Sequence, residues 1–336
     1  MSRFQRYLLT KTLWFALAFF ISLAANFFLP RLVPGNPVDA IIARMSAGGA
    51  ESTTLQQVHE TFIKEFNLDK PAWQQFLTYL GNLLHGNLGT SFGNYPSSVR
   101  GLIAAALPWS LALQLPAILI GWIIGNILGA FAAYRGGWFD RGAFVSSVLV
   151  SAVPYYCLAI LLLYGFAVHW QIFPSAGGYS FSRSPDWSWG FFTDALHHYW
   201  LPFFSLVLVI IGGQAVGMRS MAIYELGSDY VGFARSLGVP DNRVVAYVFR
   251  NAMLPQVTGL ALSIGAIAGG ALITEIVFSY PGIGTVLFNA IGQNDYPVIQ
   301  GVTLVILITV LVANFLVDIA YGLIDPRIRA AQTGER

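Results

Sequence analysis

The sequence predicts an all-α membrane protein with six transmembrane helices. Three observations support this prediction. The chain of 336 residues is 56% hydrophobic and only 10% charged, whereas a soluble domain carries roughly 25% charged residues. Its mean hydropathy is +0.62. It also contains apolar runs of about 20 residues, the length that crosses the hydrocarbon core. Because charge is costly in lipid, much of the surface is expected to face the bilayer.

In chain order, the predicted spans are residues 11–30, 107–134, 143–168, 199–218, 253–278 and 299–324. The apolar part of the first run extends from Leu13 to Leu29, which is longer than the apolar region of a secretory signal. No small-residue cleavage site follows it, so the sequence predicts an uncleaved first span. Residues 1–336 then form a single transmembrane domain with a long segment at 31–106 and a polar loop at 219–252.

The distribution of basic residues predicts the orientation, because short cytoplasmic loops carry an excess of Lys and Arg. Among the short loops, one side of the membrane has only Arg183, while the other side has the remaining basic residues, namely Arg3, Arg6, Lys11, Arg135, Arg141, Arg219, Arg235, Arg243, Arg250, Arg327 and Arg329. Both termini and the 219–252 loop are therefore predicted to be cytoplasmic. The segment 31–106 is predicted to be extracytoplasmic, since long segments translocate with little regard to charge.

The extracytoplasmic segment 31–106 is too long to be a simple connection. Thr54 begins a capping-box pattern, and the apolar residues after it have helical spacing. A second amphipathic stretch runs from Trp73 to Leu84, after Pro71. These patterns predict a small helical cap, which either docks a binding protein or closes the outer face of the transmembrane domain.

Glycines recur at intervals of four residues in the predicted spans. Gly121, Gly125 and Gly129 follow one another in the second span, and Gly213 and Gly217 share the spacing in the fourth. Small residues at this interval let helix backbones approach closely in a membrane. They indicate either packing within this chain or an interface with a second membrane subunit.

Two short amphipathic helices are predicted in the cytoplasmic loop. Ser228 is the expected N-cap of the first, and Gly238 its C-terminal glycine. Helical spacing places four apolar residues on one stripe of this helix: Tyr230, Phe233, Ala234 and Leu237. The stripe rests either on the ends of the spans or in a groove of a partner protein.

The second helix of the loop is predicted to be capped by Asp241. Its apolar face consists of Val244, Val245, Val248 and Phe249. Pro255 is expected to begin the next span.

Composition excludes several kinds of activity. The chain has three lysines, Lys11, Lys64 and Lys70, and none follows a glycine, so it has no phosphate-binding P-loop motif. If ATP drives it, another subunit supplies the hydrolysis.

The net charge of +2 does not indicate nucleic-acid binding. A single cysteine, Cys157, excludes an internal disulfide. No catalytic constellation is visible, because all five histidines lie in or beside outer segments. We therefore predict a chain that is not itself an enzyme and holds no cofactor or metal.

Few polar residues occur inside the predicted spans. Asn126, Gln214 and Ser263 are candidates for lining a transport pathway. Glu275 is placed near the outer interface and Asp318 toward the cytoplasmic end, both with structural roles. A proton-coupled transporter is expected to have paired carboxylates or histidines near the midplane, and this chain does not. A secondary transporter or channel is therefore the less favoured class.

The loop from Ser228 to Pro255 resembles the EAA loop of ABC importer permeases. Ala234 and Gly238 match the motif's second alanine and its glycine, whereas Gly232 and Phe233 replace its glutamate and first alanine. Further blocks resemble the permeases of the dipeptide, oligopeptide and nickel family, namely Arg31–Val38, Gly86–Phe92, Glu275–Gly284, Asp295–Gly301 and Asn314–Arg329. The resemblance extends over nearly the whole chain.

This resemblance implies the architecture of a type I ABC importer permease in the inner or plasma membrane of a prokaryote. It implies that a coupling helix docks on the ATP-binding subunits through Tyr230, Phe233, Ala234, Arg235, Leu237 and Gly238. Its partners would be a second and distinct permease, two cytoplasmic ATP-binding subunits and an extracytoplasmic substrate-binding protein. The transported solute would be a dipeptide or oligopeptide, with oligosaccharide or a nickel complex as alternatives.

Overall fold

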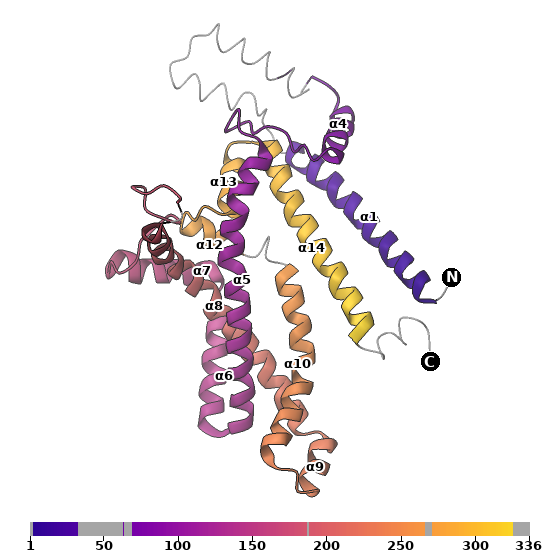
Figure 1. Ribbon diagram of the computed structural model, residues 1–336, viewed down its shortest axis with the longest axis vertical. Helices are drawn as coiled ribbons and strands as arrows, with labels where there is room; N and C mark the ends of the chain where they lie inside the picture. The colour runs from indigo at the N-terminus through magenta and orange to yellow at the C-terminus, as the bar shows by residue number, and fades with distance from the viewer. Residues whose placement is uncertain (1–2, 33–62, 64–68, 187, 266–270, 325–336) are drawn as a thin grey trace. The chain divides into compact units, whose positions relative to one another are not determined.

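A computed structural model describes residues 3–32, 63, 69–186, 188–265 and 271–324 (Figure 1). Every named element among these residues is a helix, and one isolated β-bridge joins Thr90 to Ser98. The predicted all-α class is therefore confirmed for the described part. The chain divides into two compact units. One contains residues 1–108, 282–311 and 322–336, and the other contains residues 109–281 and 312–321.

Among the described residues, three helices are long and apolar enough to cross a membrane. They are α1 (Arg3–Leu32), α5 (Val99–Arg135) and α8 (Trp189–Leu226). These helices contain the predicted spans 11–30, 107–134 and 199–218. The last predicted span, 299–324, coincides with α14 (Tyr296–Ile324).

The predicted span 143–168 is not one straight helix. It is divided between α6 (Gly137–Ala152) and α7 (Tyr155–Leu162), which continues as the π-helix η1 (Leu163–His169). The two parts meet at an angle of 95° and together form a possible fourth crossing. The break has a local cause, because Pro154 has no N–H and disfavours helical geometry in the residue before it. Val153 accordingly has extended backbone angles.

The predicted start of the fifth span at Pro255 is wrong. Helix α10 (Asp241–Gly265) begins in the polar loop and continues through Pro255, so the second helix of the loop and this span are one element. Val244, Val248 and Ala252 are buried in one cluster on its first half. This packing stabilises the helix across the proline, whose missing N–H removes one backbone hydrogen bond. Residues 266–270 lie outside the described part, and α12 (Leu272–Val277) follows them.

The unit that contains the chain's N-terminal part includes α4 (Ala72–Leu84) and α13 (Ile283–Gly292). Its core joins the first turns of α5 to α13 and to the start of α14 through Val99, Ile103, Ile283, Val298 and Val302. The other unit has two clusters. One surrounds Leu113, Leu206 and Tyr280, and the other surrounds Met218 and Val231.

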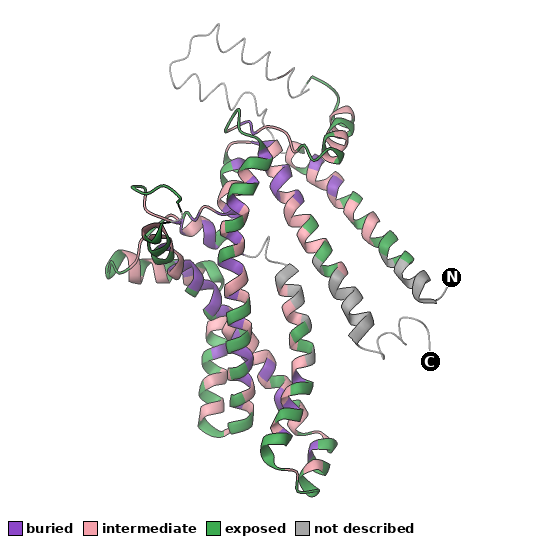
Figure 2. Cartoon of the chain, in the orientation of Figure 1, coloured by how far each residue is buried: buried purple, intermediate pink, exposed green. Residues whose placement is uncertain are grey.

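Helices α5 and α8 pack closely through the predicted glycines. A Cβ added at Gly121 would lie 2.6 Å from Ile210, and one at Gly125 would lie 2.7 Å from the Ile211 carbonyl. One added at Gly129 would clash with the Ala215 carbonyl. Packing within the chain is therefore confirmed for these three residues. In Figure 2 buried residues recur along α8, whereas α6 has a single buried residue, Ser147.

Candidate functional site

The loop between α8 and α10 carries the short helix α9 (Asp229–Ser236), which begins directly after Ser228 as predicted. Its two faces differ in burial. Val231 is 1% exposed and, with the partly buried Ala234, packs on Met218 of α8 and Val244 of α10. This inner face holds α9 against the ends of the two long helices.

The outer face of α9 is open. Phe233 and Leu237 are each 66% exposed, and Tyr230 is 36% exposed. The predicted single stripe is therefore divided between two faces, because Ala234 lies on the inner side with Val231, a residue that the sequence pattern did not single out. Exposed large apolar side chains on a short helix are typical of a surface that binds a partner.

Gly238 ends α9 with the left-handed geometry that glycine favours, at φ +72°. Gly238 N–H donates to the Arg235 carbonyl at 3.0 Å, and Val239 N–H donates to the Ala234 carbonyl at 3.1 Å. This pair of bonds is a Schellman motif, which confirms the predicted C-terminal glycine. No described atom lies within 4 Å of a Cβ built at Gly238. Its backbone conformation, rather than crowding, therefore explains the glycine.

Two predicted caps of the loop differ in detail. Ser228 has the N-cap position, but its hydroxyl donates to the Glu225 carbonyl at 2.6 Å instead of accepting a bond from α9. Asp241 is not a cap, because it is the first residue of α10, and the carbonyl of Pro240 accepts the N–H of Arg243. An acidic residue in the first turn still interacts favourably with the helix dipole.

Polar contacts hold the remaining residues of the loop. The Tyr230 hydroxyl donates to Glu225 Oε2 at 2.7 Å. Partial burial, and then this bond to a carboxylate, raise the pKa of the Tyr230 phenol above its usual value. Arg235 is half exposed, with its Nε 3.9 Å from Asp241 Oδ1. Arg235 thus leaves its guanidinium accessible beside Phe233 and Leu237.

A cavity of about 300 Å³ lies within the same unit, lined by α5, α6, α7, α8, α10 and Ala271. Two of the three predicted pathway residues, Gln214 and Ser263, line it. Gly213 also lines it, and no described atom lies within 4 Å of a Cβ built there. The described lining contains no charged side chain, and its hydrogen-bonding groups are Gln114, Ser151, Gln214, Ser263, Trp122 and Tyr155.

Asn126, the third predicted pathway residue, does not line the cavity. It is 1% exposed, and its Nδ2 donates to the Trp122 carbonyl one turn earlier at 2.7 Å. Among the described residues, no donor reaches its Oδ1. Asn126 therefore lies in the helix-packing interior, one turn beyond Trp122 on the same face of α5 and outside the cavity lining.

Sequence reasoning missed Gln114, although the criterion that selected Gln214 applies to it. Gln114 lies in an apolar run, lines the cavity, and donates to Glu275 Oε1 at 3.2 Å. Glu275 is fully buried within the protein, and its depth near the outer interface stays a prediction. Helix α12 is a separate short helix packed on α7 and α8, so Glu275 does not belong to the helix that contains Pro255. Trp122 and Tyr155 carried no sequence signal.

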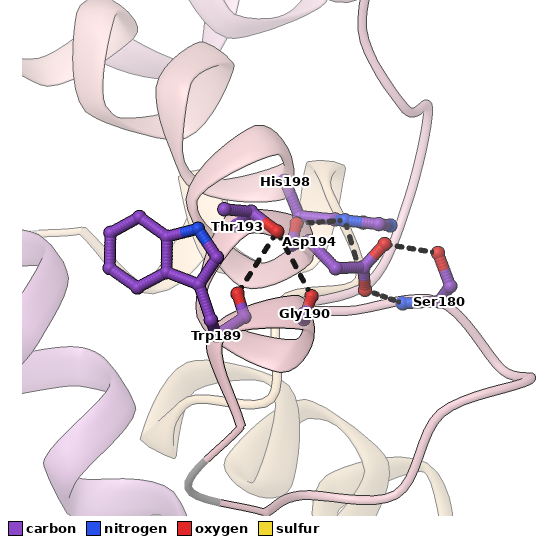
Figure 3. Close-up of polar contacts among 6 residues, drawn as sticks. All are labelled: Ser180, Trp189, Gly190, Thr193, Asp194 and His198. Carbon is purple, nitrogen blue, oxygen red and sulfur yellow. Dashed lines mark hydrogen bonds and ion pairs between the residues drawn. The ribbon is translucent and has the colours of Figure 1, made fainter.

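Outside these two regions, Asp194 of α8 binds Ser180 in the loop that precedes this helix (Figure 3). Its carboxylate accepts the Ser180 N–H and hydroxyl, both at 2.7 Å, and His198 Nδ1 contacts the Asp194 carbonyl at 2.9 Å. Nucleophilic catalysis needs a serine hydrogen-bonded to a base. Here the Ser180 hydroxyl donates to the carboxylate of Asp194, and His198 contacts the Asp194 backbone, so these residues do not form a serine–histidine pair.

The predicted outer cap is described in part. Helix α4 (Ala72–Leu84) follows Pro71 and confirms the second amphipathic stretch. The capping box at Thr54 lies outside the described residues. The described part of the chain holds no group of three His, Cys, Asp or Glu side chains arranged for a metal ion.

Comparison with known proteins places these features in one family. Residues 125–330 match the family described as binding-protein-dependent transport system inner membrane component, and this range contains α9 and most of the cavity. The chain is 35% identical over 319 residues to the di/tripeptide transport system permease protein DppB of Pseudomonas aeruginosa, with 90% of this chain and 93% of that protein covered. It is 32% identical to the dipeptide transport system permease protein DppB of Escherichia coli, with 90% of this chain and 93% of that protein covered. It is 30% identical to the oligopeptide transport system permease protein AppB of Bacillus subtilis, with 90% of this chain and 92% of that protein covered.

Proposed function

Because this chain belongs to the family of binding-protein-dependent transport system inner membrane components, we propose that it forms part of the translocation pathway of a bacterial ABC importer for dipeptides or oligopeptides. The observation that carries the peptide assignment is the similarity, over nine-tenths of the chain, to permeases named for peptide transport. The cavity chemistry adds independent support.

Neutral groups that both donate and accept hydrogen bonds line the cavity, including Gln114, Gln214 and Ser263. A peptide backbone offers the same mixture of donors and acceptors. Trp122 and Tyr155 add aromatic surface for side chains of different kinds. Without a charged group in the described lining, a solute is held weakly, which suits passage rather than storage. Selectivity would then belong mainly to the binding protein.

Oligosaccharide is the second candidate, since hydroxyl groups would also bind this lining and sugars stack on aromatic rings. A nickel complex has less support, because none of the described lining residues supplies the imidazole or thiolate that suits this metal.

We further propose six spans, with both termini and α9 on the cytoplasmic side. In this arrangement α9 inserts its outer face, Phe233 and Leu237, into a groove on one of two ATP-binding subunits. A distinct second permease would complete the pathway, and an extracytoplasmic binding protein would deliver the solute. Hydrolysis of ATP would occur entirely in the ATP-binding subunits.

The connections of α9 support a coupling role. Only two residues, Gly227 and Ser228, separate α8 from α9, and the turn at Gly238 connects α9 to α10. The same two long helices supply Gln214 and Ser263 to the cavity. A push on α9 would therefore act on two helices that form the cavity wall, which is how closure of the ATP-binding subunits could change access to the pathway.

The test is to purify the tagged chain from its own host in mild detergent and to identify the co-purifying subunits by mass spectrometry. The recovered complex is then reconstituted with its binding protein, and uptake of labelled dipeptide, maltotriose and chelated nickel is measured. We expect uptake of the peptide that requires both ATP and the binding protein. Uptake of the sugar alone would reassign the solute, and uptake without ATP would contradict the importer.

A further inference from the structure

A second cavity, of about 270 Å³, lies in the unit that contains the chain's N-terminal part. It is bordered by the end of α1, by α4, by the loop at 87–92 and by the start of α14. Its volume approaches the lower end of the range for small-molecule sites. It belongs to neither the coupling surface nor the cavity of the proposed pathway.

Arg31 carries the only charge among the described residues that line this cavity. Its Nη1 donates to the Phe27 carbonyl at 2.8 Å, and its Nε and Nη2 lie 3.4 and 3.3 Å from Gln75 Oε1. The guanidinium carbon is 3.6 Å from the centroid of the Phe27 ring. No carboxylate of the described part pairs with it. Within the described part, the partners of this partly buried guanidinium are neutral, so its positive charge is available to an anion.

Gln75 of α4 holds the Arg31 side chain in its orientation. Gln75 Nε2 donates to the Lys70 carbonyl at 2.9 Å, which leaves its Oε1 directed at the guanidinium. Tyr79 lies on the next turn of α4, and its buried hydroxyl makes no hydrogen bond of standard geometry within the described part. Its polar neighbour is Asn26, whose amide also bonds to Gln300 and Thr303. A buried polar group without a partner marks a position that a water or a ligand fills.

The surroundings of the cavity are those of a membrane interface. Arg31 lies at the end of the apolar stretch Thr12–Leu32, a candidate span, so it stands at the level of the lipid headgroups. On α4, Gln75, Thr78, Tyr79 and Asn82 line the cavity. The large apolar residues of the same helix, Trp73, Leu77 and Leu84, are instead 59%, 57% and 88% exposed. A helix with an exposed apolar face beside the end of a span is typical of the interface.

We propose that this cavity binds the phosphodiester headgroup of an anionic phospholipid such as phosphatidylglycerol. Arg31 neutralises the phosphate through its free N–H donors, and Asn82 and Thr90 offer hydrogen bonds to the glycerol hydroxyls. The acyl chains lie along the exposed apolar side chains of α1, including Leu29 and Leu32. No acidic residue in the described lining is available for the ammonium group of a zwitterionic lipid. The proposal rests on α1 being a membrane span and not on the identity of the transported solute.

The test uses the full-length chain, extracted with its native partners and reconstituted in nanodiscs of equal parts phosphatidylglycerol and phosphatidylcholine. Lipids that remain bound after transfer to detergent are counted by native mass spectrometry. We expect phosphatidylglycerol to be enriched on the wild type and the enrichment to fall about tenfold in Arg31→Gln, because a charge-assisted hydrogen bond is lost. Arg31→Lys retains the charge and should retain most of the enrichment.

Arg183→Gln is the matched control, since it removes one charge from an exposed outer-loop arginine that does not line the cavity. It should bind as much phosphatidylglycerol as the wild type. Should Arg31→Gln fail to assemble, Tyr79→Phe removes a single hydroxyl from the wall and should lower the enrichment measurably. Equal enrichment in the wild type and in the assembled cavity variants would overturn the proposal. Displacement of the lipid by millimolar inorganic phosphate would also overturn it, by assigning the site to a soluble anion.

Discussion

Arg219 and Asp140 are joined by two hydrogen bonds of 2.6 Å, one from Nε to Oδ1 and one from Nη2 to Oδ2. This pair ties α8 to the first turn of α6, and the Arg219 guanidinium also lies 4.5 Å from the Phe144 ring centroid. The two side chains are 21% and 14% exposed. A bidentate pair of this kind is stronger than an ordinary surface ion pair.

Arg219→Ala and Asp140→Ala are each expected to lower the free energy of unfolding by about 1–2 kcal/mol, because the partner charge then stays partly buried and unpaired. The double variant should lose less than the sum. Thermal unfolding of the purified complex measures this. Arg235→Ala is the control, since the contact of Arg235 with Asp241 is 3.9 Å long and half exposed. Additive losses at residues 140 and 219 would show that the pair is not coupled.

Gly129→Ala is expected to destabilise the packing of α5 on α8. The new methyl group would clash with the Ala215 carbonyl, so the two helices must separate. Overpacking of this kind costs about 1–3 kcal/mol. The matched control is Gly142→Ala on α6, where no described atom lies within 4 Å of the added Cβ. A melting temperature for Gly129→Ala equal to that of the control would contradict the close approach.

The two faces of α9 should separate stability from coupling. Val231→Ala removes a buried side chain and should lower stability by about 1–2 kcal/mol. Phe233→Ala changes an exposed residue and should alter stability by less than about 0.5 kcal/mol. We expect Phe233→Ala, although stable, to lose ATP-dependent uptake and retention of the ATP-binding subunit. If it transports normally, the outer face of α9 is not the docking surface.

Gln214 and Asn126 make a further contrast. Gln214→Leu removes a hydrogen-bonding group from the cavity and should reduce the maximal uptake rate several-fold while the complex still assembles. Asn126→Leu removes a buried amide whose Oδ1 has no described partner, and should leave uptake unchanged and stability equal or higher. Uptake measured in proteoliposomes decides between them. Loss of uptake in Asn126→Leu with normal uptake in Gln214→Leu would reverse the assignment.

The local sequence pattern alone was sufficient to predict several helices. The apolar runs of α1, α5 and α8 predict helices long enough to span a bilayer, because their length and hydropathy are properties of consecutive residues. The same holds for α4 after Pro71 and for α9 between Ser228 and Gly238, where a proline and a glycine act on their immediate neighbours. Blocks of sequence along the chain also identified the family.

Tertiary contacts determine the features that the sequence pattern did not predict, namely where helices break and which residues are buried. Pro154 breaks a predicted span while Pro255 lies inside a continuous helix, and the difference is the buried cluster around Val244 and Val248 that holds α10 together. Gln214 lines the cavity and Asn126 is buried away from it, and the apolar pattern of each helix taken alone does not distinguish the two positions. Hydropathy and spacing describe one helix at a time. Burial, cavities and the partner of a charge such as Arg219 depend on residues distant in the chain, so only the folded structure could place them.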